Sequence, residues 1–212
     1  NRRLTGRLAD LHFAPPALAK QNLLDEGINS DSIYLTGNTV LDALKQVTGE
    51  RVTHGADGKR MILVTTHRRA HWGAPLEEIA LALRDIVEAF PDTRIVLPMH
   101  KNPVVREPLQ RILGNHGRVQ LIEPPDYMDF VKLMEGAHLV LTDSGGVQEE
   151  APSSGKQVWV LRETTERPEG VGAGTALLVG TGKAGIIAEA ARLLANQDAY
   201  HAMAHAVSPY GD

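Results

Sequence analysis

The sequence predicts a three-layer α/β/α domain in which helices cover both faces of a parallel sheet. From about residue 61 onward, short aliphatic and β-branched runs alternate with longer segments whose apolar residues recur at helical spacing. This alternation is typical of strand–helix–strand units, whose strands lie parallel. A glycine pair, Gly145-Gly146, follows one of the apolar runs after only two residues, Asp143 and Ser144. It supports the same fold, because the strands of α/β sheets often turn into the next helix at glycines.

The strands and helices of this domain follow from their apolar patterns. Leu76, Ile79 and Leu83 recur on one face and predict a helix. Asp126 is a good N-cap for another. The expected strands are 61–66, 94–98, 119–122, 138–142, 158–161 and 176–179, and the expected helices include 76–90, 127–134 and an alanine-rich one over about 185–204. Together these elements predict a Rossmann-like domain.

The first forty residues do not show this regular alternation of strand and helix patterns. A helical pattern places Leu4, Leu8 and Leu11 on one face, and a short apolar run then ends at a proline pair. We interpret residues 1–40 as the tail of a preceding domain plus a hinge, and residues 41–212 as the main domain. An extension packed on the same sheet fits the pattern about as well. The chain also looks cut at both ends.

Composition excludes several classes of protein. The formal net charge is −4, and the lysines and arginines are scattered without aromatic residues between them, so no nucleic-acid partner is expected. No apolar run approaches the roughly 18 residues that span a bilayer, so no membrane partner is expected and the cytoplasm is the expected location. With no cysteine, and nine histidines in no ligand-like pattern, we expect no metal.

The stretch 143–152 is the strongest functional signal, because it follows an apolar strand and contains the glycine pair. Gly145 and Gly146 are expected to let the backbone turn sharply and approach a ligand, while the N-terminus of the next helix favours an anion. Ser144 adds a hydroxyl donor. Glu149 and Glu150 lie about one turn further on, where an acceptor suits a ribose diol. A nucleotide site is therefore predicted, although an unoccupied turn with two solvated glutamates fits the same pattern.

Other strand ends carry groups that suit a phosphate ligand. His67-Arg68-Arg69 follows the first strand of the sheet, at the edge expected for Ser144. An arginine fork matches phosphate, and a histidine can protonate a departing phosphate oxygen. His100 ends the next strand, and the loop before Phe130 could line a base pocket, although a structural role suits both residues. The charged loop 162–169 is a further candidate, or a solvated connection.

Several of these signatures occur together in one family. The chain resembles the non-hydrolysing UDP-N-acetylglucosamine 2-epimerases nearly from end to end. This family usually has an acidic and then a small polar residue after the arginine pair, where this chain has Ala70-His71. The segments that carry the resemblance are His67-Arg68-Arg69 with Trp72-Gly73 beyond it, 98–103, 143–152, 162–170 and Ser208-Pro209-Tyr210-Gly211.

The resemblance implies a glycosyltransferase-B-like protein of two domains, of which this chain supplies the C-terminal, UDP-binding one. The family interconverts UDP-N-acetylglucosamine and UDP-N-acetylmannosamine by eliminating UDP and adding it back, without a metal or a nicotinamide cofactor. A homodimer is implied for the intact protein, and little or no turnover for this chain alone. By similarity, the site residues are His67 at the leaving phosphate, Ser144, Gly145, Gly146, Glu150, Arg167 and Phe130 on UDP, and Arg68 and His100 on a second, activating UDP-N-acetylglucosamine.

Three other functions share features of this sequence. A hydrolysing epimerase, which releases free N-acetylmannosamine, would look similar in this half. A UDP-sugar-binding module without a catalytic half is a second alternative. The donor domain of a glycosyltransferase is a third, but His67-Arg68-Arg69 and the loop 162–170 argue against it.

Overall fold

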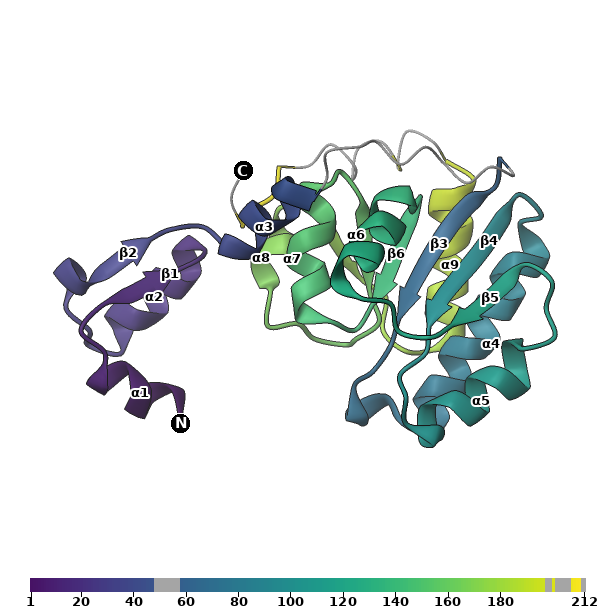
Figure 1. Cartoon of the computed structure of the whole chain (residues 1–212), viewed down its shortest axis with the longest axis horizontal. Helices are drawn as coiled ribbons and strands as arrows, with labels where there is room; N and C mark the ends of the chain where they lie inside the picture. The colour runs from purple at the N-terminus through teal and green to yellow at the C-terminus, as the bar shows by residue number, and fades with distance from the viewer. Residues whose placement is uncertain (48–57, 197–199, 201–206, 211–212) are drawn as a thin grey trace.

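The computed structural model describes residues 1–47, 58–196, 200 and 207–210. Its main part is a six-stranded parallel sheet in the order β5-β4-β3-β6-β7-β8 (Figure 1). The first strand, β3, lies at the centre, and the chain adds strands on one side of it before crossing to the other. The strands are β3 (Arg60–Thr65), β4 (Thr93–Pro98), β5 (Val119–Ile122), β6 (Leu139–Thr142), β7 (Gln157–Val160) and β8 (Ala176–Leu178). The predicted Rossmann-like fold is confirmed.

Two apolar clusters hold helices against opposite faces of this sheet. Alternate residues of each strand point to opposite faces, so Ile62 and Val64 join one cluster while Leu63 joins the other. The first cluster is covered by α4 (Ala74–Ala89), α5 (Pro103–Leu113) and α9 (Lys183–Leu194), and the second by α3 (Thr39–Val47), α6 (Tyr127–Gly136) and α7 (Gly145–Ser153). Burial on both faces explains why the strands read as continuous apolar runs.

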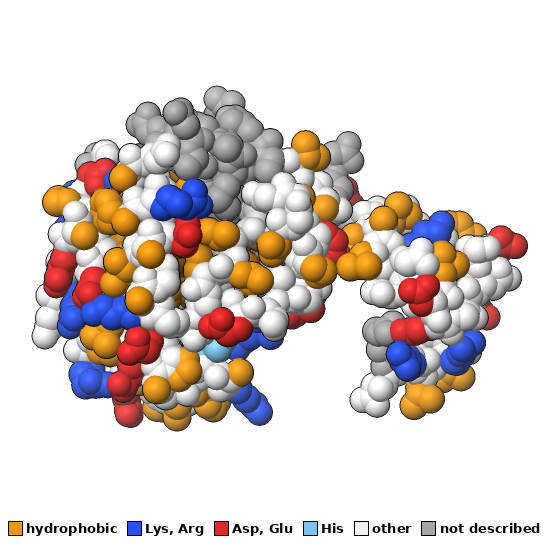
Figure 2. All heavy atoms as spheres, turned by 180° about the vertical axis from the view of Figure 1, so that it is seen from behind, with side chains coloured by type: hydrophobic (Ala, Val, Ile, Leu, Met, Phe, Trp, Pro, Cys, Tyr) orange, Lys and Arg blue, Asp and Glu red, His pale blue; other side chains and the backbone are white. Residues whose placement is uncertain are grey.

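A smaller unit precedes the sheet and stands apart from it, joined by a narrow neck (Figures 1 and 2). Its two strands pair in parallel, with Phe13 opposite Tyr34. Leu4 and Leu8, on the predicted apolar face of the first helix, are 72% and 86% exposed. The elements are α1 (Arg2–Leu8), β1 (His12–Ala14), α2 (Ala17–Asp25), the 3₁₀ turn η1 (Ser30–Ser32) and β2 (Ile33–Leu35).

Some predicted boundaries differ from the structure. The helix expected over about 185–204 ends at Leu194, and Ala195 is its C-cap. Of the remainder of that prediction, residues 197–199 and 201–206 lie outside the described residues, as does Gly211 of the terminal motif. The charged loop after β7 contains a short helix that was not predicted, α8 (Pro168–Gly172), and η2 (Arg69–His71) follows β3. No helix in the described ranges is long and apolar enough to cross a membrane.

Candidate functional site

The candidate site lies where β3 and β6 end side by side. Thr65 pairs with Thr142 at the carboxyl ends of these strands, so the residues that follow each strand meet. Since the chain extends the sheet from β3 in both directions, this is also the point at which strand order reverses, where α/β proteins bind ligands. The prediction that His67, Arg68 and Ser144 share one edge is confirmed.

Asp143 lies at the centre of this edge and is fully buried. Its carboxylate accepts hydrogen bonds from the Thr66 hydroxyl at 3.1 Å and from the backbone N–H groups of His67 and Arg68, each at 3.0 Å. Arg68 Nε also donates to the Asp143 carbonyl oxygen at 2.8 Å. Sequence reasoning placed Asp143 in the motif but assigned it no role. The loop after β3 is thus fastened to the loop after β6 through this one residue.

Two histidine rings contact the same carboxylate. His67 Nδ1 lies 3.0 Å from one Asp143 oxygen, and His71 Nδ1 lies 3.1 Å from the other. The hydrogen bond to Asp143 raises the pKa of His67, and this outweighs the opposing effect of partial burial. Burial by itself would raise the pKa of Asp143, but the hydrogen bonds from His67, His71 and the Arg68 N–H hold it well below its usual range. Asp143 therefore carries a charge at neutral pH.

The N-terminus of α7 opens beside this cluster. Ser144 is the N-cap, and its backbone N–H donates to the Thr142 hydroxyl at 2.9 Å. Gly145 and Gly146 form the first turn, but neither has a positive φ. The turn into α7 therefore does not use the conformational freedom of glycine, because the backbone conformation of both residues is open to any residue. Their remaining advantage is the absence of a side chain, which exposes N–H groups to an approaching anion.

Glu149 and Glu150 are neighbours with different partners, and both are buried, contrary to the solvated alternative. Glu149 is bonded by the Asn38 amide and by Arg167 Nε. Glu150 accepts a hydrogen bond from the Tyr127 hydroxyl at 3.0 Å. Burial raises the pKa of Glu150, the Tyr127 hydrogen bond lowers it, and the charge of Glu149 raises it further. Burial and the bond to Glu150 raise the pKa of Tyr127 to about 12.

The loop after β7 supplies further charged side chains to the candidate site. Glu166 pairs with Arg68 at 2.6 Å and also with Arg162. Although burial alone would raise it, these two arginines lower the pKa of Glu166 to about 2. A methyl group on Gly145 would lie 3.4 Å from Arg167 Cζ, so that guanidinium stands beside the first turn of α7. Arg68 and Arg167 are therefore both held at the predicted anion position.

His100 and Phe130 lie at neighbouring strand ends without a described contact to this cluster. His100 is exposed, and its Nδ1 accepts a hydrogen bond from the Asn102 N–H at 3.2 Å. Phe130 is half-buried and packs against the apolar cluster beneath α6. Their ligand roles stay predictions. No group of three or more histidine or acidic side chains in the described part of the chain is arranged to hold a metal.

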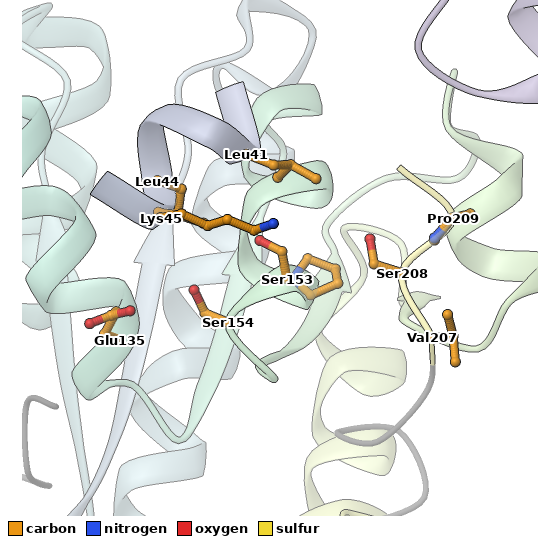
Figure 3. Close-up of a pocket in the computed structure, with 10 residues that line it drawn as sticks. Leu41, Leu44, Lys45, Glu135, Ser153, Ser154, Val207, Ser208 and Pro209 are labelled. Carbon is orange, nitrogen blue, oxygen red and sulfur yellow. The ribbon is translucent and has the colours of Figure 1, made fainter. Parts of the chain in front are cut away.

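A cavity of about 660 Å³ lies elsewhere, at the C-terminal end of α7 (Figure 3). Leu41, Leu44 and Lys45 of α3 line one side of it, and Ser153 and Ser154 lie across from them. The C-terminal end of a helix carries negative partial charge, which disfavours an anion. A diphosphate is therefore expected at the opposite, N-terminal end of α7.

The fold and the site are those of an α/β protein in which a helix N-terminus suited to an anion lies at the switch point of the sheet, with a buried carboxylate about one turn along that helix. The whole chain, residues 1–212, matches the family described as UDP-N-acetylglucosamine 2-epimerase. The chain belongs to this family. Sequence and structural comparisons therefore agree with the resemblance derived from the motifs.

Individual relatives are similar along the whole chain. The UDP-N-acetylglucosamine 2-epimerase of Bacillus subtilis is 50% identical, and the match covers 100% of this chain and 57% of that protein. A Staphylococcus aureus protein in a co-structure with UDP is 47% identical with a TM-score of 0.95, over 100% of this chain and 59% of that one. The Neisseria meningitidis enzyme bound to UDP-GlcNAc is 44% identical with a TM-score of 0.91, over 100% and 60%. The chain thus spans about three fifths of the length of these relatives.

Proposed function

We propose that this chain is the UDP-binding domain of a UDP-N-acetylglucosamine 2-epimerase, an isomerase that interconverts UDP-N-acetylglucosamine and UDP-N-acetylmannosamine. One observation carries the proposal: a histidine, two arginines and the N-terminus of α7 meet at the switch point of the sheet, with Glu150 one turn deeper. Membership of the family, and the UDP and UDP-GlcNAc in the related structures, support it. The domain would form one half of a glycosyltransferase-B-like protein.

The proposed contacts follow the order of groups along UDP. The free N–H groups of Gly145 and Gly146, with the Ser144 hydroxyl, suit the diphosphate. Arg167 stands beside Gly145 and would add a charge-assisted hydrogen bond. Glu150 is buried at a depth that suits the ribose hydroxyls, because an ionised carboxylate accepts from a diol. Tyr127 and Phe130, at the start of α6, would line the uracil end of the site.

The proposed reaction breaks two bonds of the sugar. A base removes the C2 proton, the C1–oxygen bond to UDP breaks, and a double bond forms between C1 and C2. Re-addition of UDP at C1 and of a proton to the other face of C2 gives the epimer. The departing diphosphate gains negative charge, which fixed donors stabilise. His67 would donate a proton or hydrogen bond to it, while by resemblance the base belongs to the other domain.

A second UDP-N-acetylglucosamine site at Arg68 and His100 stays a proposal. Arg68 is held by Glu166 and by the Asp143 carbonyl, so its orientation does not depend on the acidic residue that Ala70 replaces. For the intact protein we also propose a homodimer, which light scattering of the full-length protein tests. The cytoplasm is the proposed location, since a chain with no cysteine has no disulfide that needs an oxidising compartment.

Calorimetric titration of UDP into the purified 212-residue chain tests the proposal. We expect binding by the wild type and a loss of about tenfold or more in Glu150→Ala, because the ribose hydroxyls lose a charged acceptor. The control is Glu88→Ala, since Glu88 is an exposed glutamate of α4. Equal affinity in the two variants would contradict the proposed contact between Glu150 and the ribose. A folded wild type that fails to bind UDP would contradict the proposed UDP site.

A further inference from the structure

In the pair formed by Asp143 and His67, the two ring nitrogens of His67 lie in different surroundings. Asp143 is fully buried, and His67 Nδ1 lies 3.0 Å from one of its oxygens. The His67 side chain is 49% exposed, so the ring is anchored on one side and open on the other. We propose that Asp143 is the positioning residue of the active site, which holds His67 with its Nδ1–H donated to the carboxylate and its Nε2 directed to the leaving phosphate. This inference rests on the proposed function.

The carboxylate can fix the ring because it is itself immobile. Its Oδ2 accepts from the Thr66 hydroxyl and from the backbone N–H groups of His67 and Arg68, and the His67 N–H also lies 3.2 Å from Oδ1. These donors come from the end of β3, whereas Asp143 ends β6, so two neighbouring strands set its orientation. A histidine that donates Nδ1–H to a fixed carboxylate keeps one tautomer and one ring orientation.

His71 makes the arrangement more constrained. It is buried, and its Nδ1 lies 3.1 Å from the second Asp143 oxygen, so a single carboxylate orients two rings. Besides Asp143, the charged group that acts on His67 is Arg68 of its own loop, which is itself paired with Glu166 from the loop after β7. The positive charge of Arg68 opposes a proton on His67, while Asp143 favours it. Asp143 is thus the group that keeps a proton available.

The proposed proton transfer involves only His67 and the substrate. In the forward direction, the proton on His67 Nε2 passes to the phosphate oxygen that leaves C1, and the ring becomes neutral with Nδ1–H still donated to Asp143. When UDP adds back, Nε2 recovers that proton. Only the Nε2–H bond of His67 changes, and Asp143 stays ionised throughout.

Nitrogen-15 NMR of the 212-residue wild-type chain tests the pair without a substitution. We expect the His67 ring to carry its proton on Nδ1 when neutral, and to titrate above the ordinary histidine pKa of about 6.5. His67→Asn assigns its signals among the nine histidines, because only one set disappears. A His67 ring protonated on Nε2 when neutral, or one that titrates at or below the ordinary value, would overturn the proposal.

Asp143→Asn tests the consequence for binding. An amide carries no charge, so we expect the His67 pKa to fall, its Nε2–H tautomer to appear, and UDP affinity at pH 6 to fall about tenfold. Thr66→Val is the matched control, because it removes a hydrogen bond to the same carboxylate but leaves the His67 contact. An Asp143→Asn protein with unchanged His67 signals would overturn the proposal, as would equal changes in Thr66→Val.

The two measurements separate this inference from the function on which it rests. UDP binding by a wild type whose His67 carries the wrong tautomer would overturn the role of Asp143 and leave the UDP site standing. The expected tautomer in a folded chain that does not bind UDP would overturn the proposed function, and with it the role of Nε2 at a phosphate. If Asp143→Asn does not fold, the wild-type spectrum alone decides the matter.

Discussion

Glu149 and Glu150 illustrate how adjacent residues of one type acquire different tasks. Both are buried in α7, yet Glu149 is ion-paired with Arg167 and bonded by Asn38, while the side chain of Glu150 meets only an uncharged hydroxyl among its described partners. A carboxylate without a cationic partner keeps capacity to accept hydrogen bonds from a ligand. Of the two, Glu150 is therefore the better candidate for the ribose contact.

The Tyr127 hydroxyl should control the pH range over which Glu150 binds UDP. Burial raises the pKa of Glu150, and the bond from Tyr127 lowers it, so Tyr127→Phe should raise it further. The ribose hydroxyls donate to the ionised form, so binding should weaken as the pH falls, and at a higher pH in Tyr127→Phe than in the wild type. Calorimetry between pH 5 and pH 8 measures this.

Tyr34→Phe is the control for this substitution, because Tyr34 is an exposed tyrosine of β2. Its pH profile should follow that of the wild type. If Tyr127→Phe lost the same affinity at every pH, its hydroxyl would act on the ligand directly and not through Glu150.

At the scale of an element, a substitution in the first turn of α7 should change ligand binding without lowering the stability of the fold. In Gly145→Ala the new methyl group would lie 3.4 Å or more from Arg167 and Glu166, which is ordinary contact. We expect unfolding free energy to stay equal or rise by up to about 1 kcal/mol, since alanine favours a helix. UDP affinity should fall about tenfold, because the methyl group stands where the phosphate approaches.

Gly172→Ala in α8 provides the matched control, because nothing lies within 4 Å of its added methyl group. It should show a similar change in urea unfolding and unchanged UDP affinity. Unchanged affinity in Gly145→Ala as well would place the diphosphate away from the first turn of α7.

The short helix α8 depends on close packing against the C-terminal segment. A methyl group on Gly170 would lie 2.8 Å from the hydroxyl oxygen of Tyr210, which is buried. Gly170→Ala should therefore lower the free energy of unfolding by roughly 1–3 kcal/mol, a usual cost of overpacking. Adding Tyr210→Phe removes the oxygen and should recover most of that loss.

Urea unfolding of the two single variants and the double variant gives the coupling free energy of this pair. Additive losses would show that the two side chains do not compete for the same space. The pair also matters for the site, because Tyr210 accepts a backbone hydrogen bond from Asn38, whose amide contacts Glu149.

At the scale of the whole molecule, binding and chemistry are expected to belong to different domains. The groups proposed to hold UDP all lie on the six-stranded unit, while by resemblance the base for C2 lies in the other domain. We therefore expect the 212-residue chain to bind UDP but to release none from UDP-N-acetylglucosamine. Proton exchange at C2 in deuterated water, followed by NMR, checks this. Detectable exchange or UDP release from the pure chain would contradict it.

The segment around Asn38 connects the smaller unit to the proposed nucleotide site. Asn38 follows the smaller unit, yet its amide reaches Glu149, which is 111 positions away and bonded to Arg167. We infer that residues near 38 are anchored from the six-stranded side. The division at residue 40 stays a prediction; α3 begins at Thr39 and packs on the six-stranded side.

Local pattern was sufficient to predict the sheet, because strands buried on both faces must be apolar along their length. It was also sufficient to place His67 and Ser144 together, since the carboxyl ends of parallel strands share an edge. Patterns were less reliable at element ends: the predicted long helix stops at Leu194, and α8 lies in a segment that reads as a charged loop.

The sequence by itself determined the fold class, the family and the edge at which the ligand groups gather, because each depends on residue type and spacing along the chain. Only the tertiary structure decided that Asp143 holds two histidines and that Glu149, unlike Glu150, is paired with an arginine. Asp143 and His67 are 76 positions apart, and nothing in either local pattern identifies the partner. Hydrogen bonds act over about 3 Å in space, so their partners are known only once the strands that carry them lie side by side.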